Sequence, residues 1–330
     1  MSNTASADTL ADSPAVFLDY DTIGPGDIDP APLARVLPAL TVHGDTRPGE
    51  RAARVADAVF VFTNKQRFGA AELDAAPALR FIGLTATGTD NVDLEAARAR
   101  GIAVCNIRDY CTASVAQHAI AMLLSLTQQL PGYQRAVQAG RWSASEQFCL
   151  FDFPIRELAG RVFGVVGWGV LGQATARLAE ALGMQVEIAA RRDAEAIPAG
   201  RVAFEELLRR ADVLSLHCPL TAATRELIGE RELALMKPDA VLLNTARGGL
   251  VDGVALADAL TRGRIGGAGI DVLDSEPPPQ DHPLVTLGHD RLIVTPHVAW
   301  AAREARQRAI DETAANVAAF LAGERRNRVD

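Results

Sequence analysis

The chain has 330 residues, of which 48% are hydrophobic and 22% are charged, and its formal net charge at pH 7 is −8. At roughly 150 residues per domain, this length predicts two domains that each bury their own core. The acidic balance offers little attraction to phosphate polymers, so we expect neither nucleic acid nor an anionic membrane as a partner. The remaining expectation is chemistry on a small molecule.

The cysteines and the N-terminal residues indicate the compartment. Four cysteines are scattered without the paired spacing of a zinc or redox site, and they are too few for a disulfide scaffold. Residues 1–14 lack the basic start and apolar centre of a secretion signal, and no apolar run reaches the roughly 20 residues that a membrane helix needs. We therefore expect a cytoplasmic protein without a metal site.

Short apolar runs alternate with helical stretches along most of the chain, which is typical of parallel sheets with crossover helices. In the first part, the runs lie at 15–20, 58–63, 79–85 and 102–106. The alternation stops over 112–160, where a helical stretch precedes an aromatic-rich one, and then resumes. We expect the interrupting segment to link domains or to meet a partner subunit.

Three glycines in the pattern G-x-G-x-x-G follow the apolar run 162–166 and open a helical stretch. In this context the backbone N–H groups and the helix dipole can hold a pyrophosphate. A tight structural turn is the alternative. The residues expected to meet the pyrophosphate are Gly167, Gly169, Val170, Leu171 and Gly172.

The next apolar run ends at Ala190, where a carboxylate would be expected to hold the adenosine ribose hydroxyls. Arg191 and Arg192 follow instead, and a guanidinium can bind a 2′-phosphate with charge-assisted bonds of about 1.5 to 3 kcal/mol each. The alternative is a solvated turn whose field is reduced by Asp193. The residues favour NADP(H) as the cofactor, with NAD(H) left open.

Polar residues follow four later apolar runs. The carboxyl ends of parallel strands share one edge of a sheet, so we expect these residues to meet at one site. Cys218, Pro219, Thr245 and Ala246 are expected to line the cofactor, whereas for Asp271 a cofactor contact and a helix N-cap both stay open. The four groups are Cys218 with Pro219, Thr245 to Arg247, Asp271, and His297.

Three of these later residues supply the groups that carbonyl reduction by a nicotinamide needs. The pKa of imidazole suits a proton donor near neutrality, which favours His297 as the acid/base. Glu276 can orient that ring and stabilise its protonated form. Arg247 can bind a substrate carboxylate bidentately, and we expect Trp300 to shape the substrate pocket. Each residue alone could be a solvated surface group.

Seven motifs in order resemble the D-isomer-specific 2-hydroxyacid dehydrogenases, and most closely their glycerate dehydrogenase/hydroxypyruvate reductase branch. The departure from the family pattern is Ala190, which puts NAD preference in doubt. The motifs are ATGTDNVD at 86–93, TASVAQHAIAMLL at 112–124, ELAGRVFGVVGWGVLGQ at 157–173, HCPLT at 217–221, MKPDAVLLNTARGGLVD at 236–252, GAGIDVLDSEPP at 267–278 and VTPHVAW at 294–300.

The resemblance implies an α/β fold with two doubly wound parallel-sheet domains. A Rossmann-type cofactor domain, 106–300, is inserted in a flavodoxin-like substrate domain made of 1–105 and 301–330, with hinges near the two crossings. The resemblance also implies that segment 112–155 builds a homodimer. Finally, it implies that the backbone of one loop binds the substrate carboxylate, and that Arg247, Glu276 and His297 have the roles given above. The loop residues are Thr87, Gly88 and Thr89.

We therefore expect hydride transfer between a nicotinamide cofactor and a small 2-keto or D-2-hydroxy acid, namely hydroxypyruvate, glyoxylate or D-glycerate. Two alternatives stay open. One is a dinucleotide-sensing, corepressor-like binding protein, against which the complete set Arg247, Glu276 and His297 argues. The other is a dehydrogenase for phosphoglycerate, phosphite or formate on the same fold.

Overall fold

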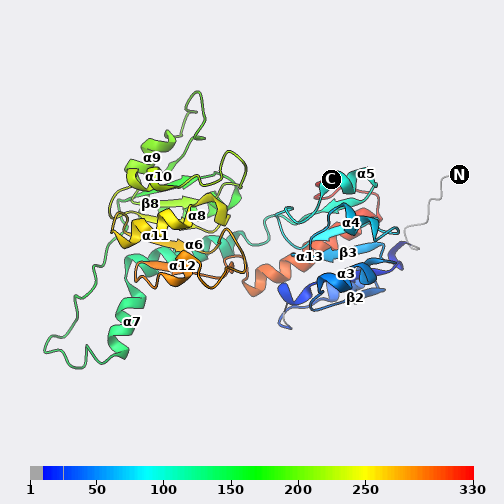
Figure 1. Ribbon diagram of the computed structural model, residues 1–330, viewed down its shortest axis with the longest axis horizontal. Helices are drawn as coiled ribbons and strands as arrows, with labels where there is room; N and C mark the ends of the chain where they lie inside the picture. The colour runs from blue at the N-terminus through cyan, green and yellow to red at the C-terminus, as the bar shows by residue number, and fades with distance from the viewer. Residues whose placement is uncertain (1–9, 25) are drawn as a thin grey trace. The chain divides into compact units, whose positions relative to one another are not determined.

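The computed structural model describes residues 10–24 and 26–330 and divides the chain into two compact units (Figure 1). We call Met1–Cys111 with Ala301–Asp330 the discontinuous unit, and Thr112–Trp300 the inserted unit. Both are parallel-sheet α/β units, which confirms the predicted fold class. Among the described residues, no helix combines the length and the apolar character that a membrane span requires.

The first crossing between the units lies after Cys111, six positions later than the 105/106 boundary expected from the sequence. Backbone hydrogen bonds explain the difference. The Asn106 N–H donates to the Asn327 carbonyl (3.2 Å), and the Ile107 N–H donates to the Ala86 carbonyl (3.1 Å). Residues 106–111 are therefore tied to the discontinuous unit.

The discontinuous unit contains a five-stranded parallel sheet of order β2-β1-β3-β4-β5, the arrangement of a flavodoxin-like fold. Its central strands are buried and aromatic, as expected for strands covered on both faces. The strands are β1 (Ala15–Phe17), β2 (Leu40–Val42), β3 (Phe60–Thr63), β4 (Phe81–Leu84) and β5 (Ala103–Cys105).

The last helix of the chain packs on this first sheet. Phe320 in α13 (Arg303–Leu321) packs on Phe60 and Phe81, with ring centroids 6.0 and 5.0 Å apart. The remaining elements of this unit are the 3-10 turn η1 (Tyr20–Thr22) and the helices α2 (Ala31–Val36), α3 (Pro48–Val55), α4 (Ala70–Asp74) and α5 (Leu94–Ala99).

The inserted unit contains a six-stranded parallel sheet of order β11-β10-β9-β8-β6-β7. Beyond β7, this sheet continues only as an isolated parallel bridge between Ala189 and Val202. A dinucleotide-binding sheet usually has a further strand at this place, and here a single residue pair replaces it. The strands are β6 (Val162–Val166), β7 (Gln185–Ile188), β8 (Val213–Leu216), β9 (Val241–Asn244), β10 (Gly267–Ile270) and β11 (Leu292–Val294).

Helices cover both faces of this second sheet. Because side chains alternate along a strand, Val241 and Leu243 pack with α6 and α8, whereas Leu242 packs with the helices of the other face. The helices are α6 (Thr112–Thr127) and α8 (Val170–Ala181) on one face, and α9 (Phe204–Arg210), α10 (Glu230–Leu235), α11 (Gly253–Thr261) and α12 (Pro283–Thr286) on the other.

A further helix, α7 (Leu130–Gln138), follows α6 and begins a segment that runs away from the rest of the inserted unit before it returns at β6 (Figure 1). We call residues 130–157 the arm. Outside α7, the arm contains neither helix nor strand, in line with the interrupted pattern in the sequence.

Candidate active site

The register of the inserted unit's sheet aligns the last residues of five strands in one row, namely Val166, Leu216, Asn244, Ile270 and Val294. Backbone hydrogen bonds continue the row by one residue on three of these strands. His217 donates its N–H to Val166 (2.7 Å), Asp271 to Asn244 (2.9 Å) and Thr295 to Ile270 (2.9 Å). The polar residues that follow the strands therefore lie along one edge of the sheet, where parallel α/β sheets bind ligands.

The glycine turn opens this edge after β6. Gly167 has a φ of +99°, and a Cβ there would lie 2.6 Å from the backbone of His217, while a Cβ on Gly172 would overlap the Gly167 carbonyl oxygen. Gly169, the N-cap of α8, has no atom within 4 Å of its Cβ position. Two glycines thus permit close packing and the middle one leaves open space, which fits a pyrophosphate against the backbone of Val170 and Leu171 at the start of α8.

Two buried polar atoms at the same edge have no hydrogen-bond partner among the described residues. They are Nδ1 of His217 and Oγ1 of Thr245. The other ring nitrogen of His217 bonds Ser215 Oγ at 2.8 Å, and burial lowers the pKa of His217 to about 4, so its ring is neutral at pH 7. Buried atoms of this kind normally bond water or a ligand. Thr245 and Cys218, the residue after His217, are both expected to line the cofactor, so the two atoms fit a cofactor at this edge.

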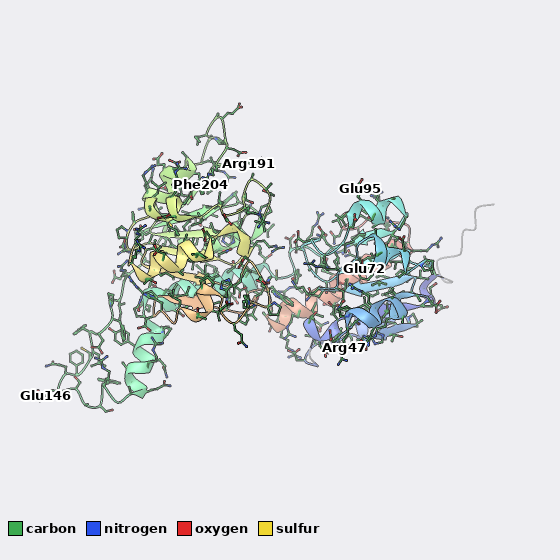
Figure 2. All side chains as sticks on the ribbon, in the orientation of Figure 1. Arg47, Glu72, Glu95, Glu146, Arg191 and Phe204 are labelled. Carbon is green, nitrogen blue, oxygen red and sulfur yellow. The ribbon has the colours of Figure 1, made fainter. Side chains whose placement is uncertain are left out.

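The two arginines that follow β7 differ in their surroundings. Nη2 of Arg192 lies 2.9 Å from Oε1 of Glu232, a buried carboxylate that also accepts the Gly229 N–H. Arg191 is exposed (Figure 2), and its guanidinium has no hydrogen bond or ion pair with any residue that the structure describes. The sequence predicts the same role for both arginines. In the structure, only Arg191 can bind a phosphate without giving up an ion pair, because Arg192 is paired with Glu232.

His297 and Glu276 form a close pair, with 2.6 Å between Nδ1 and Oε2. The second carboxylate oxygen of Glu276 accepts the Leu273 N–H at 2.9 Å, so the carboxylate is fixed from both sides. Nδ1 is taken by the carboxylate, which leaves Nε2 of this half-exposed ring as the nitrogen that can face a ligand.

Arg247 follows β9 and belongs to a loop that packs directly on the loop bearing Glu276. A Cβ on Gly248 would overlap the backbone of Leu273, so the two loops are in backbone contact. The Asn244 side-chain amide fixes the first loop by donating to the Arg247 carbonyl at 2.9 Å. A guanidinium, a carboxylate and an imidazole are thus brought to the same edge by three different strands.

Asp271 has a third role, which neither of the two sequence alternatives describes. Its carboxylate is 1% exposed and accepts the N–H groups of Val298 and Ala299, both at 2.9 Å, and the Thr295 hydroxyl at 2.6 Å. It is the N-cap of no described helix. It holds the loop that carries His297, and a contact between Asp271 and the cofactor stays a prediction.

The other expected substrate contacts lie in two places. Trp300 belongs to the His297 loop, where its Nε1 donates to the His297 carbonyl at 2.8 Å. Thr87, Gly88 and Thr89 lie in the discontinuous unit after β4. Their loop is fixed there because Thr87 donates through Oγ1 to the Ile107 carbonyl at 2.9 Å. Their binding of substrate stays a prediction.

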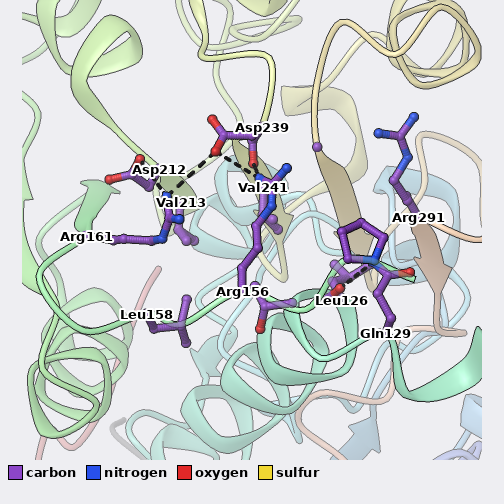
Figure 3. Close-up of a pocket in the computed structure, with 13 residues that line it drawn as sticks. Leu126, Gln129, Arg156, Leu158, Arg161, Asp212, Val213, Asp239, Val241 and Arg291 are labelled. Carbon is purple, nitrogen blue, oxygen red and sulfur yellow. Dashed lines mark hydrogen bonds and ion pairs between the residues drawn. The ribbon is translucent and has the colours of Figure 1, made fainter. Parts of the chain in front are cut away.

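A cavity at the opposite edge of the inserted sheet has a different character (Figure 3). Charged side chains that line it form ion pairs, with Arg156 2.9 Å from Asp239 and Arg161 3.5 Å from Asp212. Asp212 also accepts the Val162 N–H at 2.7 Å. This cluster ties strand starts together, far from the residues that the sequence predicts for chemistry.

Residues 120–299 match the family model described as "D-isomer specific 2-hydroxyacid dehydrogenase, NAD binding domain". A glycerate dehydrogenase of Methylorubrum extorquens is 44% identical over 86% of this chain and 89% of its own length. A hydroxypyruvate reductase of Blautia hydrogenotrophica is 38% identical over 93% and 97%, respectively. The crystal structure of the TT0316 protein from Thermus thermophilus superposes with a TM-score of 0.84 at 36% identity, covering 96% of this chain and 99% of that one.

The glycine turn generates a paired prediction. Gly169→Ala adds a methyl group to open space, so unfolding free energy should change by less than about 0.5 kcal/mol, while affinity for the nicotinamide cofactor falls at least roughly tenfold because the backbone can no longer approach the pyrophosphate. Gly172→Ala should cost about 1 to 3 kcal/mol of stability through overpacking. Thermal unfolding measures stability, and fluorescence titration with NADPH measures cofactor affinity. Equal stability losses in both variants would contradict the separate roles of Gly169 in binding and Gly172 in packing.

Proposed function

The chain belongs to the D-isomer specific 2-hydroxyacid dehydrogenase family, and on this premise we propose that it reduces hydroxypyruvate or glyoxylate to the corresponding 2-hydroxy acid with NADPH. As a member of this family it is an oxidoreductase that transfers hydride between a nicotinamide cofactor and a 2-hydroxy or 2-keto acid. The observation that carries the proposal is the His297 and Glu276 pair beside the Arg247 loop.

The proposed chemistry assigns one task to each of these groups. When bound, the nicotinamide supplies the hydride that reduces the keto carbon. His297 delivers the proton to the carbonyl oxygen through Nε2, so hydride and proton together complete the two-electron reduction. Glu276 orients the ring, because its carboxylate lies 2.6 Å from Nδ1 and leaves Nε2 to face the substrate.

Arg247 is proposed to bind the substrate carboxylate. A guanidinium presents two parallel N–H donors to a carboxylate, which fixes the orientation of the keto group as well as its position. Substrates without an acid group would lack this anchor. Small keto acids are favoured because the glycerate dehydrogenase and the hydroxypyruvate reductase align with this chain over most of their own length. The D-3-phosphoglycerate dehydrogenases of Archaeoglobus fulgidus and Methanocaldococcus jannaschii, at 37% and 36% identity, align over only 46% and 47% of theirs.

The preference for NADPH is proposed from Ala190 and Arg191. Ala190 is buried and carries no carboxylate that would repel a 2′-phosphate. Arg191 is exposed beside it, and its guanidinium has no partner among the described residues. Arg192 contributes less, since its guanidinium is already paired with Glu232.

A second copy of the chain is proposed to cover the arm. Phe148 and Phe151 are 87% and 90% exposed, and Trp142 is 51% exposed. Large apolar side chains gathered on one projecting segment mark a protein interface. Glu146, between them, marks the outer part of the arm in Figure 2. We infer a homodimer, as the family resemblance implied.

The proposed acid/base role predicts that His297→Ala lowers kcat by roughly 10²- to 10⁴-fold while NADPH affinity stays within about twofold. The assay follows nicotinamide absorbance with hydroxypyruvate, glyoxylate and 3-phosphohydroxypyruvate, each with NADPH and NADH. His289→Ala, which changes a histidine outside the site, is the control. Wild-type turnover in His297→Ala would remove it from the mechanism, and absence of turnover by the wild type with every pair would favour the corepressor-like alternative.

The cofactor proposal predicts that Arg191→Ala raises the KM for NADPH roughly ten- to hundredfold, since it removes charge-assisted hydrogen bonds of about 1.5 to 3 kcal/mol. The KM for NADH should change less than about twofold. Arg192→Ala is the matched control, and its effect on NADPH should be smaller because of the Glu232 pair. Equal effects of Arg191→Ala on the two cofactors would reject phosphate binding.

The homodimer predicts that wild-type protein has twice the chain mass by light scattering. Phe151→Asp should shift it towards the monomer, because a carboxylate would be buried without a partner at the interface. Val254→Asp changes a side chain that is 69% exposed on α11 and should leave the mass unchanged. A monomeric wild type, or a dimer unaffected by Phe151→Asp, would contradict the interface.

A further inference from the structure

The loop that carries His297 has an unusual backbone. His297 has a φ of +55°, in the left-handed region that side chains with a Cβ disfavour. Such a conformation persists only where the surroundings over-determine it. The His297 N–H is held by the carbonyl groups of Asp271 (2.8 Å) and Thr295 (3.0 Å), and the His297 carbonyl accepts from Trp300. Any interaction that holds Asp271 or Thr295 in place therefore also holds the backbone of His297.

Asp271 is the centre of this support. Its carboxylate accepts from both backbone N–H groups that follow His297 and from the Thr295 hydroxyl. It is 1% exposed, and among the described residues no lysine or arginine forms an ion pair with it. A buried carboxylate without a cationic partner depends on its hydrogen-bond donors. The loss of one donor should therefore disturb the loop.

His118 provides the next link, from helix α6. Its Nε2 lies 3.0 Å from Thr295 Oγ1 and 3.6 Å from Asp271 Oδ1. The single hydroxyl proton of Thr295 is donated to Asp271, so Thr295 can only accept from His118. Nε2 of His118 must then carry a proton. The result is a directed chain of donors from His118 through Thr295 to Asp271.

We propose that His118 is a positioning residue for His297, acting through Thr295 and Asp271. The proposal rests on the proposed acid/base role of His297, and it adds a residue of α6 that acts through Thr295 and Asp271. The Ser114 hydroxyl, one turn earlier on α6, donates to the Ala299 carbonyl at 2.6 Å. Helix α6 is thereby a rigid support that holds both ends of the loop bearing His297.

The test removes the donor and then restores it. His118→Leu and Thr295→Val should each lower kcat about tenfold, while the KM for NADPH changes less than twofold, because the cofactor site at the glycine turn is intact. His118→Gln keeps an N–H donor and Thr295→Ser keeps the hydroxyl, and both should retain more than half of kcat. The double variant His118→Leu/Thr295→Val should fall no further than either single variant, since both break one chain.

His289→Leu is the control for loss of a histidine elsewhere in the inserted unit, and near-ultraviolet circular dichroism with NADPH titration checks folding. Full kcat in His118→Leu, or additive losses in the double variant, would overturn the proposal. If His118→Leu does not fold, the two Thr295 variants test the proposal. It then requires that Thr295→Ser keeps more than half of kcat and that Thr295→Val loses about tenfold. His297→Ala is measured in parallel. If His297→Ala is inactive and His118→Leu is fully active, only this inference fails, whereas an active His297→Ala contradicts the proposed function itself.

Discussion

The backbone hydrogen bonds between parallel strands are the constraint on which the site depends. They set the register that puts Val166, Leu216, Asn244, Ile270 and Val294 in one row. Each following residue then leaves the sheet at the same edge, although the five strand ends are separated by up to 128 positions in the chain (294 − 166). A shift of one strand by one residue would turn its side chains to the other face and remove its contribution to the edge.

Beyond the sheet, close backbone approach assembles the site. Gly167 and Gly172 let the first turn lie against its neighbours, and Gly248 lets the Arg247 loop lie against the Glu276 loop. Buried hydrogen bonds then fix what the glycines bring together. Asp271 is the clearest case, because one carboxylate holds three donors from the His297 loop. Precision of this kind is what proton transfer requires, since reach and alignment decide whether a group can act as an acid or base.

Much of this arrangement could be predicted from the sequence. The alternating runs predicted two parallel-sheet units, and the glycine pattern and the polar residues after strands predicted which edge of the second sheet matters. These signals are local, which is why sequence periodicity detects them. The family assignment made from seven motifs is confirmed by the matching family model and relatives.

The residue roles that the sequence did not predict depend on contacts between residues far apart in the chain. Arg191 and Arg192 are neighbours of one type, yet Glu232, 40 positions after Arg192, separates their roles. The function of Asp271 depends on a loop 24 to 28 positions later, and His118 is 177 positions before Thr295. The division after Cys111 differs from the expected 105/106 boundary because Asn327 holds Asn106 from the other end of the chain. No local pattern encodes such pairings.

The return of α13 to the first sheet also bears on how the protein is made. The inserted unit is continuous in sequence, so it has all its strands as soon as residue 300 has left the ribosome. The discontinuous unit still lacks the Phe320 ring that packs on Phe60 and Phe81 at that moment. Its sheet therefore cannot complete this packing until the last helix has also left the ribosome.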